Sequence, residues 1–377
     1  MLVSNTSWYL YNFRRGTIAA LKSAGYVVVA LSPTDPFSAR LESELGVCHR
    51  HLDLDGKGTR LLGEAKSLFG LGLSLRRLQP AFVFNFTVKA NIYSGLVCRV
   101  LGIPYANNVS GLGTAFIHNS WLFRRVRSLY GLANAGAGRV FFQNREDHEL
   151  FVGHGLLKNT PTTVLPGSGM DLERFGFSSL PPALPFTFVM VARLLGDKGV
   201  REYARAAELV RQVHPQARCL LLGQLGTSNR TAIEKTELDE WVSAGHLIYE
   251  GETDDVRPFL RQAHVLVLPS YREGMPRTVL EAAAMGRPAI VSDVPGCRHA
   301  IRPGETGWLC TVRDAESLAT QMLHAMDRPF SELQQAGYAA RQLMVAEFDE
   351  AIVVRAYLAC LKSSLAPAAA EPQASDI

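Results

Sequence analysis

The sequence predicts an α/β protein of two domains, each built on a parallel sheet that helices cover on both faces. Short apolar runs alternate with helical stretches along the chain, which is the pattern of parallel sheets. The chain has 377 residues, more than one ordinary domain needs. Segments rich in glycine, proline and serine, at 165–169 and 178–185, separate two rounds of the alternation. We therefore expect the hinge between the domains there.

The elements follow from this alternation in chain order. Apolar runs of three to six residues are typical of strands buried on both faces. In the first domain they predict strands at 1–4, 26–31, 82–86, 105–108 and 140–143, with helices at 13–24, 58–78 and 91–101. In the second domain they predict strands at 186–191, 219–222, 247–249, 265–268 and 289–291, and a last helix at 349–362. The expected division is 1–165, 166–345, a helix at 346–363 that crosses back to the first domain, and a disordered tail at 364–377.

Charge is distributed unevenly between the two halves. Residues 1–165 hold 18 Lys and Arg against 9 Asp and Glu, whereas residues 166–377 hold 21 against 26. Between Glu64 and Glu146 there is no acidic residue, while ten are Lys or Arg. This excess of positive charge in the first domain predicts that it binds an anionic surface or an anionic substrate. Charge alone does not distinguish nucleic acid from a membrane leaflet.

Several classes of protein are disfavoured by what the sequence lacks. The six cysteines are scattered without a Cys-x-x-Cys pair, which predicts a reduced cytoplasmic protein rather than a disulfide or zinc framework. No run of 18 apolar residues predicts a membrane span, and a strand that starts at Met1 leaves no room for a secretory signal. Neither a P-loop nor a complete Gly-x-Gly-x-x-Gly motif occurs. We interpret Asp53-Leu54-Asp55 as a turn, and 48–51 lacks the second ligand cluster that a metal site needs.

The most informative segment runs from Tyr271 to Gly296. Its carboxylates Glu273 and Glu281 bracket a strand-to-helix turn, with Pro276 suited to the first helical turn and a buried strand at 265–268. Glu273 thus lies at the carboxyl end of a strand, where open α/β sheets bind ligands. Glu281 lies about one and a half turns into the helix, so both carboxylates face one crevice. Such carboxylates suit the hydroxyls of a sugar or a ribose.

A pair of cations follows the first strand of the second domain. Arg193 lies in the loop after 186–191, and Lys198 lies beside a helix that starts near Val200. The helix dipole disfavours a cation there by a few tenths of a kcal/mol to about 1 kcal/mol, so its placement indicates an anion held between it and the helix amides. Arg193 offers a second, forked contact to phosphate oxygens. The alternative is that Arg193 and Lys198 are two solvated surface charges. The presence of four charged residues at strand ends of one sheet disfavours it: Arg193, Lys198, Glu273 and Glu281.

These residues resemble the retaining glycosyltransferases of the GT-B architecture, specifically family four, over about residues 4–310. The resemblance implies two Rossmann-like domains that face each other across a cleft, and catalysis by Glu273, Arg193 and Lys198. Arg193 and Lys198 would bind the donor diphosphate, Glu273 the transferred sugar and Glu281 the nucleotide ribose. The main chain of Gly274, Met275 and Pro276 would lie near the donor, with the base near 250–256. The resemblance further implies a UDP-sugar donor, an N-acetylhexosamine or hexose, retention of configuration, and no cofactor or metal.

Two departures narrow the resemblance. Asn5 and its neighbours stand where many members have a glycine pair, and the loop after 105–108 lacks a histidine near the donor sugar. In these two departures, and in segments 87–94 and 107–113, the sequence resembles bacterial enzymes that extend polyprenyl-diphosphate-linked saccharides in surface-glycan assembly. The predicted acceptor residues are Lys89, Asn108, Gly111 and His118.

The predicted location is the cytoplasm, with peripheral association to the inner face of the membrane. Segments 67–77 and 121–127 mix Trp, Phe and Leu with Lys and Arg, as interfacial docking surfaces do. An ordinary core-facing helix with a basic edge is the alternative for each. The predicted partners are a nucleotide sugar, a polyprenyl-diphosphate-linked saccharide and an anionic membrane, but not nucleic acid. Domain closure about 166–185 would exclude water.

Two other functions remain as alternatives. A nucleotide-sugar epimerase on the same architecture would bind the donor but need no acceptor and no membrane face. A non-catalytic subunit would bind lipid-linked glycan or nucleic acid, although intact Arg193, Lys198, Glu273 and Glu281 argue against lost catalysis.

Overall fold

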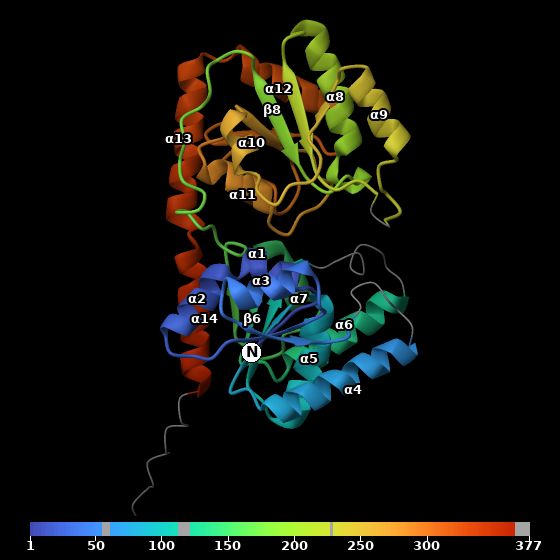
Figure 1. Cartoon of the computed structure of the whole chain (residues 1–377), viewed down its shortest axis with the longest axis vertical. Helices are drawn as coiled ribbons and strands as arrows, with labels where there is room; N and C mark the ends of the chain where they lie inside the picture. The colour runs from blue at the N-terminus through green and yellow to red at the C-terminus, as the bar shows by residue number, and fades with distance from the viewer. Residues whose placement is uncertain (55–60, 112–120, 227–228, 366–377) are drawn as a thin grey trace, which may run out of the picture. The chain divides into compact units, whose positions relative to one another are not determined.

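The structure is a computed structural model that describes residues 1–54, 61–111, 121–226 and 229–365, with the side chains of 61–65 and 121–125 left out. The chain forms two compact units (Figure 1). Unit 1 comprises Met1–Ser168 and Ala351–Ile377, and unit 2 comprises Gly169–Glu350. Each has one sheet of parallel strands with helices on its faces, which confirms the predicted α/β class.

The sheet of unit 1 has seven strands in the order β3-β2-β1-β4-β5-β6-β7. The strand order reverses between β1 and β4, which is where open parallel sheets form a crevice at their carboxyl ends. The strands are β1 (Leu2–Val3), β2 (Val29–Ser32), β3 (Cys48–His51), β4 (Val83–Phe86), β5 (Tyr105–Val109), β6 (Arg139–Phe142) and β7 (Thr162–Val164).

Two hydrophobic clusters hold helices against the two faces of this sheet. Helices α4, α5 and α6 lie side by side on one face (Figure 1). Apolar residues of α1, α2, α3 and α14 share the cluster on the other face, where the Tyr357 hydroxyl of α14 donates to Asn108 Oδ1 at 2.6 Å. The helices are α1 (Ser7–Phe13), α2 (Arg15–Ser23), α3 (Pro36–Ser43), α4 (Leu61–Leu78), α5 (Val88–Leu101), α6 (Trp121–Asn134), α7 (Arg145–Gly153) and α14 (Glu350–Leu365).

The sheet of unit 2 has six strands in the order β10-β9-β8-β11-β12-β13, and its order reverses between β8 and β11. A single hydrophobic cluster joins the sheet to its helices. The strands are β8 (Thr187–Val191), β9 (Arg218–Leu222), β10 (Ile248–Tyr249), β11 (Val265–Leu268), β12 (Ala289–Ser292) and β13 (Gly307–Cys310). The helices are α8 (Val200–Val213), α9 (Lys235–Ser243), α10 (Arg257–Gln262), α11 (Arg277–Ala284), α12 (Ala315–Asp327) and α13 (Phe330–Glu347), with short 3-10 helices at Gly196–Lys198 and Arg298–Ala300.

Several predicted elements need correction. The helix predicted at 13–24 is two helices that meet at Arg14, whose buried guanidinium carbon lies 4.4 Å from the centre of the Phe86 ring. The strand predicted at 26–31 starts only at Val29, because the Tyr26 N–H still donates to Leu21 O at the end of α2. The helix predicted at 91–101 already starts at Val88.

Strands β3, β7 and β13 were not predicted at all, whereas the remaining strands other than β2 agree with prediction to within one residue at each end. β3 and β7 are short or polar edge strands, where one-sided pairing does not require a continuous apolar run. Among the described residues no helix combines the length and the hydropathy that crossing a bilayer requires. All six cysteines are free thiols.

Candidate functional site

The strand order of unit 2 brings two loops to the same sheet edge. The loop after β8 carries Arg193 and Lys198, and the loop after β11 carries Glu273. Neighbouring parallel strands end at the same edge, so these loops start side by side. Gly199, with φ +75°, marks their contact, because a Cβ there would lie 2.2 Å from Pro269 O. Only glycine therefore fits at the point where the loops meet.

Lys198 and Glu273 form the centre of the site. Lys198 Nζ lies 2.5 Å from Glu273 Oε1, and the Ser270 hydroxyl donates to the same oxygen at 2.8 Å. The two charged side chains are only 20% and 15% exposed, so water screens their attraction less than on an open surface. Lys198 ends a 3-10 helix, and α8 begins after Gly199 without a side-chain cap. The first amides of α8 thus remain available for an anion beside the ammonium.

The backbone that follows Glu273 is fixed by a close approach. Gly296, in the loop after β12, has φ +81°, and a Cβ there would lie 2.4 Å from Glu273 O and 2.6 Å from Gly274 O. Met275 is half-buried, and Pro276 is buried as the N-cap of α11 rather than within its first turn. Arg193, by contrast, is exposed in its loop. A ligand at this edge would therefore meet the fixed backbone of 273–276 and the long, exposed side chain of Arg193.

Glu281 lies within α11 and is paired along the helix. Arg277 Nε donates to Glu281 Oε1 at 3.0 Å, and the side chains of Arg277 and Glu281 are 19% and 12% exposed. Burial raises the pKa of the Glu281 carboxyl, while the charges of Arg277 and Arg174 lower it and Asp255 raises it further. A carboxylate in this setting gains from hydroxyl donors that replace its lost water.

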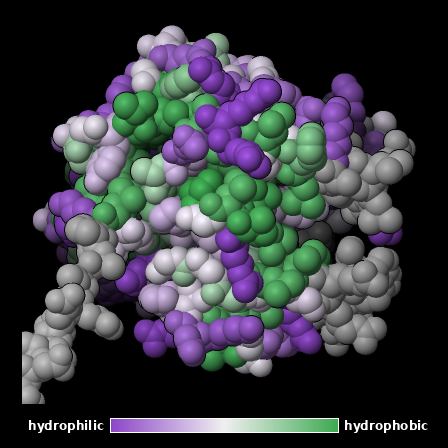
Figure 2. Space-filling view, turned by 90° about the horizontal axis from the view of Figure 1, so that it is seen from below, coloured by the Kyte–Doolittle hydropathy of each residue, from purple (hydrophilic) through white to green (hydrophobic). Residues whose placement is uncertain are grey.

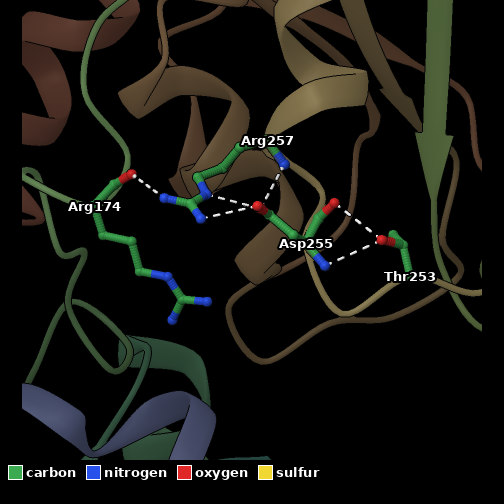
Figure 3. A network of polar contacts seen from close by, with 4 residues as sticks. All are labelled: Arg174, Thr253, Asp255 and Arg257. Carbon is green, nitrogen blue, oxygen red and sulfur yellow. Dashed lines mark hydrogen bonds and ion pairs between the residues drawn. The ribbon is translucent and has the colours of Figure 1, made fainter.

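Asp255, whose charge raises the pKa of Glu281, belongs to a polar network with Thr253, Arg257 and Arg174 (Figure 3). Arg257 binds the Asp255 carboxylate through Nε at 2.7 Å and Nη2 at 2.8 Å, and these hydrogen bonds hold the pKa of Asp255 below its usual value. The Thr253 hydroxyl accepts from the Asp255 N–H at 3.1 Å. Arg257 Nη1 also donates to Arg174 O at 3.3 Å. These hydrogen bonds hold the 250–256 loop, which is predicted to lie near the base, against the segment that contains Arg174.

The predicted acceptor residues lie in unit 1. Lys89 is half-buried in the first turn of α5, after β4, at the point where the strand order reverses. Asn108 is buried in β5, where its side chain donates to Asn85 O at 3.1 Å and accepts from Tyr357. Gly111 follows β5 with φ +142°, whereas His118 lies outside the described residues. The Asn108 side chain therefore makes hydrogen bonds within the core of unit 1, whereas Lys89 and Gly111 lie at the carboxyl edge of the sheet.

Sequence reasoning missed three residues of the site: Ser270, Arg277 and Gly296. Ser270 gave no signal beyond its place after a strand. Arg277 had one, because an arginine four residues before a glutamate on a helix predicts an ion pair. The role of Gly296 depends on two loops meeting in space, which no local pattern reveals. In the described part of the chain, no group of three or more His, Cys, Asp or Glu side chains is placed to hold a metal ion.

Comparisons with known proteins agree with this geometry. Residues 185–328 match the family model described as glycosyl transferases group 1. The chain is 27% identical over 373 residues to N,N'-diacetylbacillosaminyl-diphospho-undecaprenol alpha-1,3-N-acetylgalactosaminyltransferase of Campylobacter jejuni, covering 94% of this chain and 96% of the relative. It is 25% identical over 290 residues to UDP-Gal:alpha-D-GlcNAc-diphosphoundecaprenol alpha-1,3-galactosyltransferase of Escherichia coli, covering 71% and 72%.

Solved structures show the same fold. Sucrose-phosphate synthase from Thermosynechococcus elongatus superposes with a TM-score of 0.78 at 20% identity, covering 97% of this chain and 98% of that one. Anabaena HepE in complex with UDP and glucose superposes with a TM-score of 0.77 at 15% identity, covering 96% and 98%. The chain is therefore a glycosyltransferase with a group 1 domain and the GT-B fold.

Proposed function

We propose that this glycosyltransferase moves an N-acetylhexosamine or hexose from a UDP-sugar to a polyprenyl-diphosphate-linked saccharide, with retention of configuration. The observation that carries the donor half is the Lys198–Glu273 pair at the reversal of strand order in unit 2. The acceptor half is supported by the two relatives above, both named for transfer to a diphospho-undecaprenol-linked sugar, one of them with UDP-galactose.

In this mechanism the protein stabilises the diphosphate that leaves with the nucleotide. Lys198 and the first amides of α8 lie together at the strand edge, and Arg193 extends from the same loop. Cations and amides fixed before the reaction act most strongly where negative charge develops. We propose that no metal is required for this step. Glu281 would accept hydrogen bonds from the ribose hydroxyls.

Glu273 would orient the transferred sugar rather than attack it. Its Oε1 is already engaged by Lys198 and Ser270, so the carboxylate is held in one position. A carboxylate held in this way accepts hydrogen bonds from sugar hydroxyls and favours one orientation of the reacting carbon. The same contact links sugar orientation to Lys198, which would bind the diphosphate.

The acceptor would bind unit 1 with its diphosphate near Lys89. Lys89 lies in the first turn of a 14-residue helix that begins at the reversal of strand order. The helix N-terminus and the lysine together favour an anion. Because the lipid tail of this acceptor stays in the membrane, unit 1 must also reach the bilayer surface.

Helices α4 and α5 provide a surface suited to an anionic membrane. Phe69 and Leu73 of α4 are 76% and 41% exposed, Val100 of α5 is 85% exposed, and Arg76 and Arg77 are exposed at the end of α4. Seen from below, the molecule carries broad hydrophobic areas divided by hydrophilic side chains (Figure 2). Apolar groups that enter the interface beside cations that meet anionic headgroups make a peripheral binding surface. We propose that this α4–α5 surface holds the protein on the inner face of the cell membrane.

Reversing two charges of the α4–α5 surface should reduce membrane binding. Each arginine near an anionic leaflet contributes about 1 kcal/mol, so Arg76→Glu with Arg77→Glu should lower the partition coefficient at least about 30-fold. Co-sedimentation with vesicles of phosphatidylglycerol and phosphatidylethanolamine measures this. The matched control is Arg50→Glu with Lys158→Glu, which reverses two exposed charges outside α4 and α5. Equal losses in both variants would assign the binding to net charge, and no loss in either would contradict the proposed surface.

Nucleotide release from a panel of sugar nucleotides tests the whole proposal. We expect UDP release only when a polyprenyl-diphosphate-linked saccharide extract is present. Product analysis by NMR would report whether the configuration is retained. Conversion of the donor without acceptor would favour an epimerase. Binding of UDP without turnover under any condition would favour a non-catalytic subunit, and tight DNA binding without vesicle binding would contradict the membrane partner.

A further inference from the structure

Arginines attach the proposed nucleotide site to one segment, Gly169–Phe175, with which unit 2 begins. Arg277, the first residue of α11, donates from Nε to Glu281 Oε1 at 3.0 Å and from Nη1 to Gly169 O at 3.3 Å. One guanidinium therefore joins the proposed ribose carboxylate to the point where the chain enters unit 2. Its planar fork allows two acceptors in fixed directions, which a lysine ammonium does not reproduce.

A second arginine makes a parallel connection. Arg257 holds Asp255 through two nitrogens, and its Nη1 donates to Arg174 O (Figure 3). The loop proposed to lie near the base is thereby attached to the same Gly169–Phe175 segment. Both nucleotide-facing parts of unit 2 share this segment as a support.

The segment is also paired with the chain that leaves unit 2. The Met170 N–H donates to Phe348 O at 2.7 Å, and the Glu350 N–H donates to Met170 O at 3.1 Å, which forms a short parallel bridge. Gly169, with φ +75°, permits this approach, because a Cβ there would lie 2.4 Å from Glu350 Cα. Burial raises the pKa of the Glu350 carboxyl, and the charge of Arg277 opposes that shift. Arg277 therefore contacts the first chain connection between the units directly, at Gly169, and reaches the second through the bridge that Met170 forms with Phe348 and Glu350.

We propose that Arg277 is a positioning residue that holds Glu281 for the nucleotide and makes both chain connections respond to nucleotide binding. This inference rests on the proposed function, because it assigns the ligand at Glu281 to a ribose. Ribose hydroxyls that bind Glu281 immobilise its carboxylate, and Arg277 transmits that restraint to Gly169 and hence to the Met170–Glu350 bridge. Opening of the bridge then becomes rarer when the nucleotide is bound.

Amide hydrogen exchange and calorimetry with UDP together test this coupling. In the wild-type protein UDP should slow exchange of the Met170 and Glu350 amides by at least about fivefold. Arg277→Met should weaken UDP binding about 10-fold or more, as loss of a charged hydrogen bond does, and should abolish the slowing. Arg277→Lys should recover part of the affinity but not the slowing, because one ammonium does not hold both acceptors.

The matched control is Arg341→Met. Arg341, on α13, donates to Leu172 O and Phe175 O of the same segment but is not part of the Arg277–Glu281 pair, so its loss should speed exchange while UDP still slows it. Wild-type affinity for UDP in Arg277→Met, or preserved slowing, would overturn the inference. If the wild-type protein binds no nucleoside diphosphate, the proposed function fails instead. In that case, amide exchange measured without ligand tests whether Arg277 supports the Met170–Glu350 bridge. An exchange rate of the Met170 amide that is the same in Arg277→Met as in the wild type would overturn that support.

Discussion

Glu273→Gln should lower the rate of sugar transfer about 10²–10³-fold, the usual effect of removing one preorganised group from a reacting centre. Glutamine keeps the shape of the side chain but loses its charge, so Lys198 is no longer held at 2.5 Å from a carboxylate oxygen. The variant should still fold, because Ser270 retains an acceptor in the amide oxygen. Steady-state UDP release with saturating lipid-linked acceptor measures the loss.

The affinity of the Glu273→Gln variant for UDP should not fall with its rate of transfer. Removing a negative charge from beside the proposed diphosphate leaves UDP affinity unchanged or stronger, because the Glu273 carboxylate no longer competes with the diphosphate for Lys198. Calorimetry with UDP measures this. Glu208→Gln, which removes the exposed Arg205–Glu208 pair, is the control and should change neither rate nor affinity. A Glu273→Gln variant that turns over normally would contradict the role of Glu273, and one that loses UDP binding would place it on the nucleotide instead.

Lys198→Met should weaken UDP binding about 10–100-fold, since a hydrogen bond to a charged group contributes about 1.5–3 kcal/mol. The aliphatic part of the side chain is kept, while the ammonium that lies beside the N-terminus of α8 is lost. Calorimetry with UDP and with uridine separates the effect on the diphosphate from the effect on the nucleoside. Uridine should bind the variant as it binds the wild type.

The stability of this variant provides an independent check. Glu273 is 15% exposed and, within the described part of the chain, keeps the Ser270 hydroxyl as its hydrogen-bond donor when Lys198 is replaced, so the free energy of unfolding should fall by about 1–2 kcal/mol. Adding Glu273→Gln to Lys198→Met should recover most of that loss, because no unpaired carboxylate remains. Unchanged UDP affinity in Lys198→Met would rule out the proposed diphosphate contact, whatever its stability.

The fold was predictable to the extent that strands are continuously apolar. β11 and β12 are buried on both faces, and Val265–Leu268 was predicted to the residue. β3, with the sequence Cys-His-Arg-His at a sheet edge, carries no such signal. The break at Arg14 was missed because a buried cation stacked on Phe86 is a tertiary contact without a local pattern.

By itself, the sequence determined that cations follow one strand of the second domain and carboxylates follow another. It determined this because buried strands, helix starts and turns have local signatures that place Arg193, Lys198, Glu273 and Glu281 at strand ends or in the adjoining helix. Only the tertiary structure decided that β8 and β11 are neighbours, so that Lys198 and Glu273, 75 residues apart, touch. Strand order depends on how helices and loops pack over the whole sheet, and no local pattern specifies it. The same holds for Arg277, whose contact with Gly169 spans 108 residues.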